Sequence, residues 1–287
     1  MSYVIITDST CSLTDQEIKE CGVKVVQLSF IIKGEEYKSN STKDIQLFYD
    51  ELRKKENAST SCINYQGFID IFDEELKKGN DILSVSFSSA LSATYQNSVM
   101  ASNDLKEKYP NRKIICVDSL MASYGGGMLI YQAGLLKKEG KTIEEVASYL
   151  NDNKLKATAL FSVEDLFYLY RGGRVKPSSY LLAKAINIKP LMHMDNEGRL
   201  VATGKVIGRK RAILSLVERL VETIEDPENQ EVYIGHGDCI KDVEFAIRLI
   251  DERIKVKGYR VTYIDPVIGV HSGPGTIAFF YFAKERV

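Results

Sequence analysis

Hydroxyl side chains gather directly after three short apolar runs of this sequence. The three groups are Asp8, Ser9 and Thr10; Ser86, Ser88, Ser89, Ser92 and Thr94; and Asp118 and Ser119. If the runs are parallel strands, their carboxyl ends share one edge of a sheet, where ligands bind close to a reversal of strand order. The pattern therefore predicts a polar ligand site at this edge.

Thr60 and Ser61 add two more hydroxyls, immediately before a predicted helix over residues 65–78. We expect their backbone amides to belong to the helix N-terminus, which attracts anions. The alternative is that each hydroxyl only caps a helix or forms a turn. Caps alone do not require so many hydroxyls, so the group that also includes Ser88, Ser89 and Ser92 favours a ligand site.

Residues 270–276 (VHSGPGT) follow a predicted strand at 260–264 and precede an aromatic run. Glycine and proline permit a tight loop with free N–H groups, and His271 can donate or accept a hydrogen bond at neutral pH. We expect His271 and Ser272 to lie at the ligand site, although a lone histidine is more often structural. Residues 170–174 (YRGGR) place Arg174 beside two glycines, where the alternative is a helix C-cap with solvated charges.

The usual catalytic and metal-binding signatures are absent from the sequence. It contains no G-x-S-x-G and no H-E-x-x-H motif, and Leu135 stands where a P-loop ending at Gly140-Lys141-Thr142 would need its first glycine. The three histidines are far apart, and the five cysteines lack zinc spacing. We therefore expect no metal, no cofactor and no catalytic residue.

The elements that must position these residues alternate between strands and helices in the first half. The strand candidates are residues 3–7, 24–30, 82–87 and 114–117. Thr14 with Glu17 and Thr142 with Glu145 fit helix capping boxes, and Gly79 and Gly140 mark helix ends. This order predicts an α/β fold with a mostly parallel sheet flanked by helices.

The order of elements changes after the polar stretch 151–156, so we predict two domains, 1–155 and 156–287. The expected elements of the second are strands 158–162, 188–194 and 200–206, helix 210–223, strand 231–236, helix 241–255 and strand 260–264. The turn at 195–198 makes the second and third of these strands a predicted hairpin. The second domain is therefore expected to be α+β, with the ligand between and within the two domains.

Composition limits the class of protein. In 287 residues, 38 Lys and Arg nearly balance 39 Asp and Glu, so no overall field attracts nucleic acid. No run reaches the roughly 18 apolar residues of a membrane span, and the amino end lacks the features of a signal peptide. The scattered cysteines are typical of reduced thiols, which predicts a cytoplasmic protein.

These residues resemble the DegV family of fatty-acid-binding proteins along nearly the whole chain. Seven motifs occur in the order typical of the family: TDST at 7–10, TS at 60–61, SSALSATYQ at 88–96, DS at 118–119, RGGR at 171–174, NIKP at 187–190 and HSGPGT at 271–276. Any one of these motifs is weak evidence for the resemblance, whereas all seven in the same order are strong evidence.

The resemblance implies two α/β-type domains around one fatty acid, and a role as the binding subunit of a bacterial fatty acid kinase. It implies that Thr60 and Ser92 bind the carboxylate, with Ser61 close by and His271 in the same hydrogen-bond network. Arg174 is expected near the site. Two further positions complete this set: Arg209 lies in a segment expected to meet the kinase, and Asn64 stands where the family often has a hydroxyl.

The expected function is therefore a non-catalytic carrier that presents a fatty acid carboxylate to a separate kinase. Burying each methylene contributes about 0.8 kcal/mol, so a tunnel can supply most of the affinity. Two alternatives remain: a lipid sensor without a kinase, and a hydrolase with Ser92 as nucleophile and His271 as base.

Overall fold

A parallel sheet of four strands forms the core of the first half of the chain. The computed structural model describes residues 2–38, 42–176 and 187–286. The sheet order is β2 (Lys24–Val26), β1 (Tyr3–Asp8), β6 (Asp81–Ser86) and β7 (Ile114–Asp118). Its helices are α1 (Asp15–Cys21), α3 (Tyr65–Lys77), α4 (Thr94–Lys108), α5 (Tyr124–Lys138) and α6 (Ile143–Asn153). The predicted α/β class is confirmed for this half.

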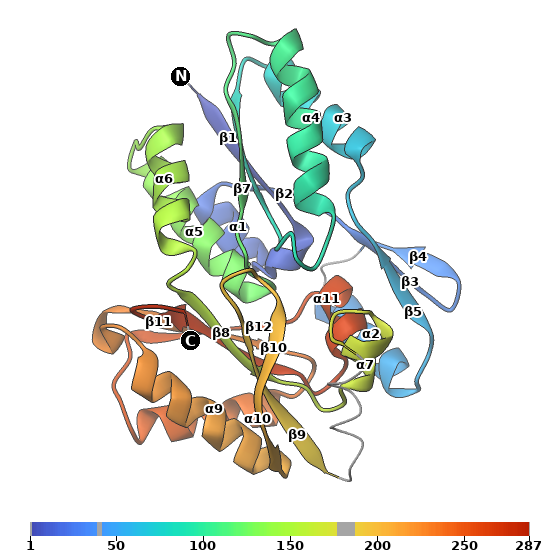
Figure 1. The fold of residues 1–287 in the computed structure, drawn as a ribbon, viewed down its shortest axis with the longest axis vertical. Coiled ribbons are helices and arrows are strands. Elements are labelled where there is room, and N and C mark those ends of the chain that lie inside the picture. Colours follow the sequence, from blue (N-terminus) through green and yellow to red (C-terminus); the bar gives the residue numbers. More distant parts are fainter. Residues whose placement is uncertain (1, 39–41, 177–186, 287) are drawn as a thin grey trace.

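A mixed sheet of six strands forms the second half. Its order is β10 (Leu200–Ile207), β9 (Ile188–Met194), β8 (Ala157–Ser162), β13 (Ile277–Phe282), β11 (Glu231–His236) and β12 (Gly258–Tyr263). Helices α9 (Arg209–Thr223) and α10 (Ile240–Asp251) pack below it in Figure 1, and α5 contacts it from the side of the first sheet. The bounds of β9 and β11 are those predicted.

A third, three-stranded antiparallel sheet was not predicted. It consists of β4 (Glu35–Tyr37), β3 (Ser29–Ile32) and β5 (Ala58–Ser61), with α2 (Thr42–Arg53), α7 (Phe167–Arg171) and α11 (Pro266–Ser272) beside it (Figure 1). The single strand predicted over residues 24–30 is wrong, because its two ends belong to different sheets. Lys24–Val26 pairs with β1, while Ser29 opens β3.

The predicted helix ends follow local capping chemistry. Thr14 and Glu17 form a capping box at the start of α1, and Thr142 and Glu145 form another at the start of α6. Gly140 follows α5 with φ +87°, a conformation that costs glycine little. Gly140 and Thr142 therefore end one helix and begin the next. The short elements η1 (Ser9–Cys11) and η2 (Pro227–Asn229) complete the described chain.

One hydrophobic core joins the two halves. The same cluster contains Ile5 and Val85 of the first sheet, Met128 of α5, and Ala159 and Phe280 of the second sheet, all at most 3% exposed. In the described residues 2–38, 42–176 and 187–286, no helix is long and apolar enough to cross a membrane. The domain division at 155/156 stays a prediction; α6 ends at Asn153 and β8 begins at Ala157.

A candidate ligand cavity between the two halves

A cavity of about 320 Å³ lies where the three sheets meet. Its wall is mostly apolar: Leu28, Phe87, Leu91, Ala93, Ala122, Ala159, Phe161, Leu169, Met194, Leu200, Ile264, Val267, Ile268, Ala278 and Phe280. The polar members of the wall are Thr10, Thr60, Ser61, Cys62, Ser92, Ser123, Arg174, His271, Ser272 and Thr276. All six residues predicted for the ligand site therefore line one cavity.

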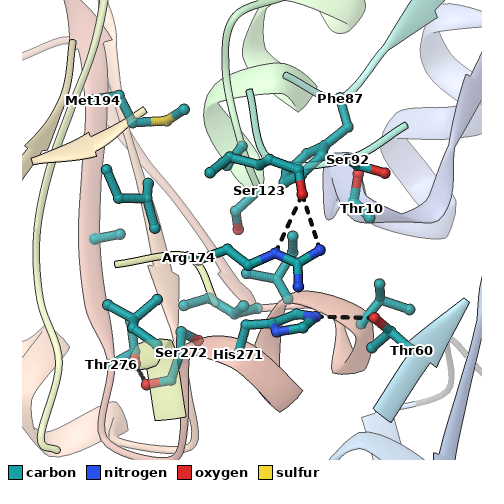
Figure 2. Close-up of a pocket in the computed structure, with 18 of the residues that line it drawn as sticks. Thr10, Thr60, Phe87, Ser92, Ser123, Arg174, Met194, His271, Ser272 and Thr276 are labelled. Carbon is teal, nitrogen blue, oxygen red and sulfur yellow. Dashed lines mark hydrogen bonds between the residues drawn. The ribbon is translucent and has the colours of Figure 1, made fainter. Parts of the chain in front are cut away.

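Four of these predicted residues form its most polar part (Figure 2). The Thr60 hydroxyl lies 2.9 Å from Nε2 of His271, and the Ser92 hydroxyl lies 2.9 Å from that of Thr94. Figure 2 shows Arg174 between Ser92 and His271, with Met194 on the opposite side of the view from Thr60. Thr60, His271, Arg174 and Ser92 therefore lie next to one another in Figure 2, in a wall that is otherwise mostly apolar.

The His271 ring is held neutral. Burial, and then the charges of Arg174 and Arg171, lower its pKa to about 4. A neutral imidazole has one N–H, and Nδ1 is a buried atom without a hydrogen-bond partner among the described residues. A proton on Nε2 avoids burying an unpaired N–H, so Nε2 donates to Thr60. The Thr60 O–H is then available to a ligand in the cavity.

Gly172 packs against the Nδ1 side of the His271 ring and so holds the ring in place. A Cβ atom at Gly172 would lie 2.2 Å from Nδ1 of His271, closer than atoms can approach. We expect Gly172→Ala to displace the ring, break the contact with Thr60 and weaken the binding of an anionic head group about tenfold. Isothermal titration with a fatty acid measures this. The control is Gly126→Ala in the helix α5, where a Cβ meets nothing within 4 Å and φ is not positive; equal losses in both variants would contradict the role of Gly172.

Arg174 holds the backbone next to Ser92. Its Nε and Nη2 atoms donate to the carbonyl oxygen of Leu91 at 3.2 and 3.0 Å, and Nη1 donates to Gly172. Burial lowers the pKa of this guanidinium. Three of its five N–H donors are used by backbone carbonyls, so Arg174 positions the Leu91–Ser92 turn.

The predicted setting of Thr60 and Ser61 is wrong. Thr60 and Ser61 are not at a helix N-terminus: they lie in β5, where Thr60 pairs with Phe30 and the Ser61 hydroxyl lies 2.6 Å from that of Ser29. Asn64 instead caps α3, with its side chain accepting from the N–H of Gly67 at 2.8 Å. Asn64 does not line the cavity.

The expected tight loop at residues 270–276 is also wrong in part. His271 and Ser272 end the helix α11, which Asp265 caps, and only Gly273 to Gly275 form a turn. A helix N-terminus near the site belongs to α4, which begins two residues after Ser92. The N–H of Thr94, the first residue of α4, donates to the Ser92 hydroxyl oxygen at 3.3 Å, and no residue of α4 lines the cavity.

Arg209 lies outside the cavity wall. Its side chain is 17% exposed and donates to Asp242 at 2.9 Å and to the carbonyl oxygen of Gly275 at 2.5 Å. It therefore joins α9 to the turn after α11. A contact of Arg209 with a partner protein stays a prediction.

Sequence reasoning missed several residues of the wall. Thr10 belongs to the TDST motif but is not among the predicted site residues, and neither Ser123 nor Cys62 is predicted. Ser123 has φ +51°, and its hydroxyl lies 3.2 Å from that of Ser12. The motifs are the signal that could have found Thr10 and Cys62, because Thr10 ends TDST and Cys62 directly follows the TS at 60–61.

Comparison with known proteins places the chain in a family. The family model described as "Uncharacterised protein, DegV family" matches residues 2–284. A DegV domain-containing protein of Clostridium perfringens is 37% identical over 286 residues, which cover 99% of this chain and 98% of that protein.

Solved structures agree with the match along the whole chain. A DegV family protein from Thermus thermophilus, described by its fatty acid binding, is 27% identical with a TM-score of 0.87, covering 99% of this chain and 100% of that one. A fatty acid binding DegV family protein from Streptococcus agalactiae is 26% identical, with the same TM-score and coverage. From its sequence and its fold, this chain belongs to the DegV family.

Proposed function

We propose that this protein binds one long-chain fatty acid in the cavity, in the cytoplasm, with the carboxylate at Thr60 and Ser92. The observation that supports the proposal is one mostly apolar cavity whose wall also contains Thr60, Ser92, His271 and Arg174. The relatives from Thermus thermophilus and Streptococcus agalactiae, which are described as binding fatty acids, support it.

The apolar wall supplies the affinity. Each methylene removed from water contributes about 0.8 kcal/mol, so even a dozen methylenes offset the cost of association. The carboxylate needs hydrogen bonds because an unpaired buried charge is costly. The hydroxyls of Thr60 and Ser92 can donate to it.

We further propose that the bound carboxylate is presented to a separate fatty acid kinase, which forms the acyl phosphate. Hydroxyl donors suit this role because they can leave one carboxylate oxygen free to attack a phosphate, whereas a bidentate arginine would occupy both. The guanidinium of Arg174 bonds to backbone carbonyls instead. Arg209 is the proposed partner contact, through the turn at Gly275 that it holds.

The first test is the lipid content of the protein. Purified from bacterial cells, it should carry about one fatty acid per chain, non-covalently. Native mass spectrometry should show the added mass, and denaturation should release it. Absence of lipid together with no uptake of added fatty acid would refute the carrier function.

The second test separates a kinase subunit from a lipid sensor. With ATP, the protein alone should form no acyl phosphate; adding a bacterial fatty acid kinase should produce it. Failure of the added kinase to phosphorylate the bound lipid would favour the sensor. Turnover by the protein alone would overturn the non-catalytic assignment.

The arrangement of Ser92 and His271 favours binding over hydrolysis. A serine nucleophile needs its base within hydrogen-bond reach. Here Nε2 of His271 bonds to Thr60, and the Ser92 hydroxyl bonds to Thr94. Esterase activity on acyl esters that disappears in both Ser92→Ala and His271→Ala would reverse this conclusion.

A further inference from the structure

The hairpin of β9 and β10 reaches across the cavity and touches the first half of the chain. Its tip, residues 195–199, is a rigid turn: the Asp195 carboxylate accepts from the N–H groups of Glu197 at 3.0 Å and Arg199 at 2.9 Å. Met194 and Leu200, on either side of the tip, both line the cavity. The hairpin is therefore part of the cavity wall as well as an edge of the second sheet.

The tip docks closely on a turn of the first half. Ser88, which is fully buried, donates to the carbonyl oxygen of Gly198 at 2.9 Å. Gly198 has φ +75°, and a Cβ atom there would lie 2.1 Å from the Ser88 hydroxyl oxygen. The carbonyl of Ser88 also accepts from the N–H of Ser92 at 3.2 Å. The hairpin tip thus rests on the turn, residues 88–92, that carries a head-group residue.

Arg286 fastens the tip from a third side. Its side chain is buried, and four backbone carbonyls accept from its guanidinium: Ala157 at 3.0 Å, Leu120 at 2.9 Å, Asp195 at 2.8 Å, and Lys154. Leu120 belongs to the first half and Asp195 to the hairpin tip. The Arg286 side chain therefore links the hairpin tip to Leu120 in the first half of the chain.

The contact between tip and turn is also a thin partition. Leu91, Arg174 and Leu200 line the cavity and, on their other side, a larger hollow that continues along β10. Leu200 comes from the hairpin and Leu91 from the turn. Separation of the hairpin tip from the 88–92 turn would join the cavity to this hollow.

We infer that the β9–β10 hairpin is a strap over the cavity, that Ser88 and Arg286 are its fastenings, and that the ligand passes between the strap and the 88–92 turn. The inference rests on the proposed function, since it concerns exchange of the fatty acid. Ser88 and Arg286 act as positioning residues: neither lines the cavity. Their effect is on the fraction of molecules in which the strap is open.

This mechanism has a kinetic signature. If uptake and release both require the open strap, weaker fastening raises the association and dissociation rates by the same factor. The equilibrium dissociation constant then stays nearly unchanged while the closed form predominates. A loss of contacts in the bound state would raise only the dissociation rate and weaken binding.

Stopped-flow fluorescence with cis-parinaric acid, a naturally fluorescent fatty acid, measures both rates on delipidated protein. We expect Ser88→Ala, which removes the hydrogen bond to Gly198 and the acceptor for the N–H of Ala90 at 3.3 Å, to raise both rates about threefold to tenfold. Arg286→Leu removes four hydrogen bonds and should raise both the association rate and the dissociation rate more than tenfold. Thermal unfolding verifies that each variant is folded. If Arg286→Leu does not fold, Ser88→Ala alone still tests the inference.

Arg260→Leu is the matched control, since Arg260 also joins the halves, to Glu17 at 3.1 Å, away from the cavity wall. We expect it to lower the melting temperature and leave both rates within about twofold of wild type. Unchanged rates in Ser88→Ala and Arg286→Leu, or equal acceleration in Arg260→Leu, would overturn the strap. Failure of the wild type to bind cis-parinaric acid would instead refute the proposed function.

Discussion

Ser92→Ala should reduce acyl-phosphate formation by a far larger factor than it reduces lipid retention. The change removes one charge-assisted hydrogen bond, worth about 1.5–3 kcal/mol, and leaves the apolar wall intact. Affinity should therefore fall about tenfold to a hundredfold. Transfer should fall further, because a carboxylate displaced by about 1 Å no longer presents its oxygen to the phosphate. Lipid retention and acyl-phosphate yield, measured on the same preparations, give the two factors.

Ser89→Ala is the control for this prediction. Ser89 lies in the same turn, but its hydroxyl is outside the cavity wall, so both quantities should stay near wild type. Thr60→Ala should show coupling to Ser92→Ala in a double-mutant cycle if the two residues share one carboxylate. Wild-type transfer rates in both Ser92→Ala and His271→Ala would show that the carboxylate lies elsewhere.

Asp265→Asn should make the protein more stable at pH 8 than the wild type, with little difference at pH 5. Burial, and also the nearby Asp8, raise the pKa of Asp265 to about 8, although the N–H of Val267 opposes this shift. Between the unfolded pKa near 4 and about 8, the folded protein holds a proton that the unfolded chain releases. The free energy of unfolding of the wild type therefore falls as the pH rises through that window.

The advantage of the variant should grow by at most about 1.4 kcal/mol per pH unit in this window. Asparagine keeps the cap of α11, because its side-chain oxygen can still accept from Val267, as Asp265 does at 2.8 Å. Urea unfolding at a series of pH values measures the difference. Asp15→Asn, at an exposed position of α1, is the control for loss of a carboxylate. A constant difference from pH 5 to pH 8 would contradict the raised pKa.

Strands with strong local patterns could be predicted from the sequence. Residues 188–194 and 231–236 are flanked by turn and helix signals, and their bounds are those of β9 and β11. Residues 24–30 carry an equally apolar pattern, yet they split between two sheets. Pairing partners decide that split, and periodicity contains no information about partners.

Residues that line the cavity could be predicted from the sequence, but the residues that hold them in place could not. Hydroxyls after strands, together with the resemblance to a known family, pointed to Thr60, Ser92 and His271. Their backbone setting was partly wrong, since Thr60 lies in a strand and His271 in a helix. The role of Arg286 has no local signal at all, because its four acceptors are distant in the sequence.

The cavity wall combines residues that are far apart in the sequence, with consequences for biosynthesis. Thr10 is synthesised long before Ile264, Ala278 and Phe280, which line the same cavity. The first sheet can form while synthesis continues, but its side of the cavity then has no opposite wall. Loading of the proposed fatty acid must therefore follow synthesis of both walls, so protein with a complete but empty cavity forms first.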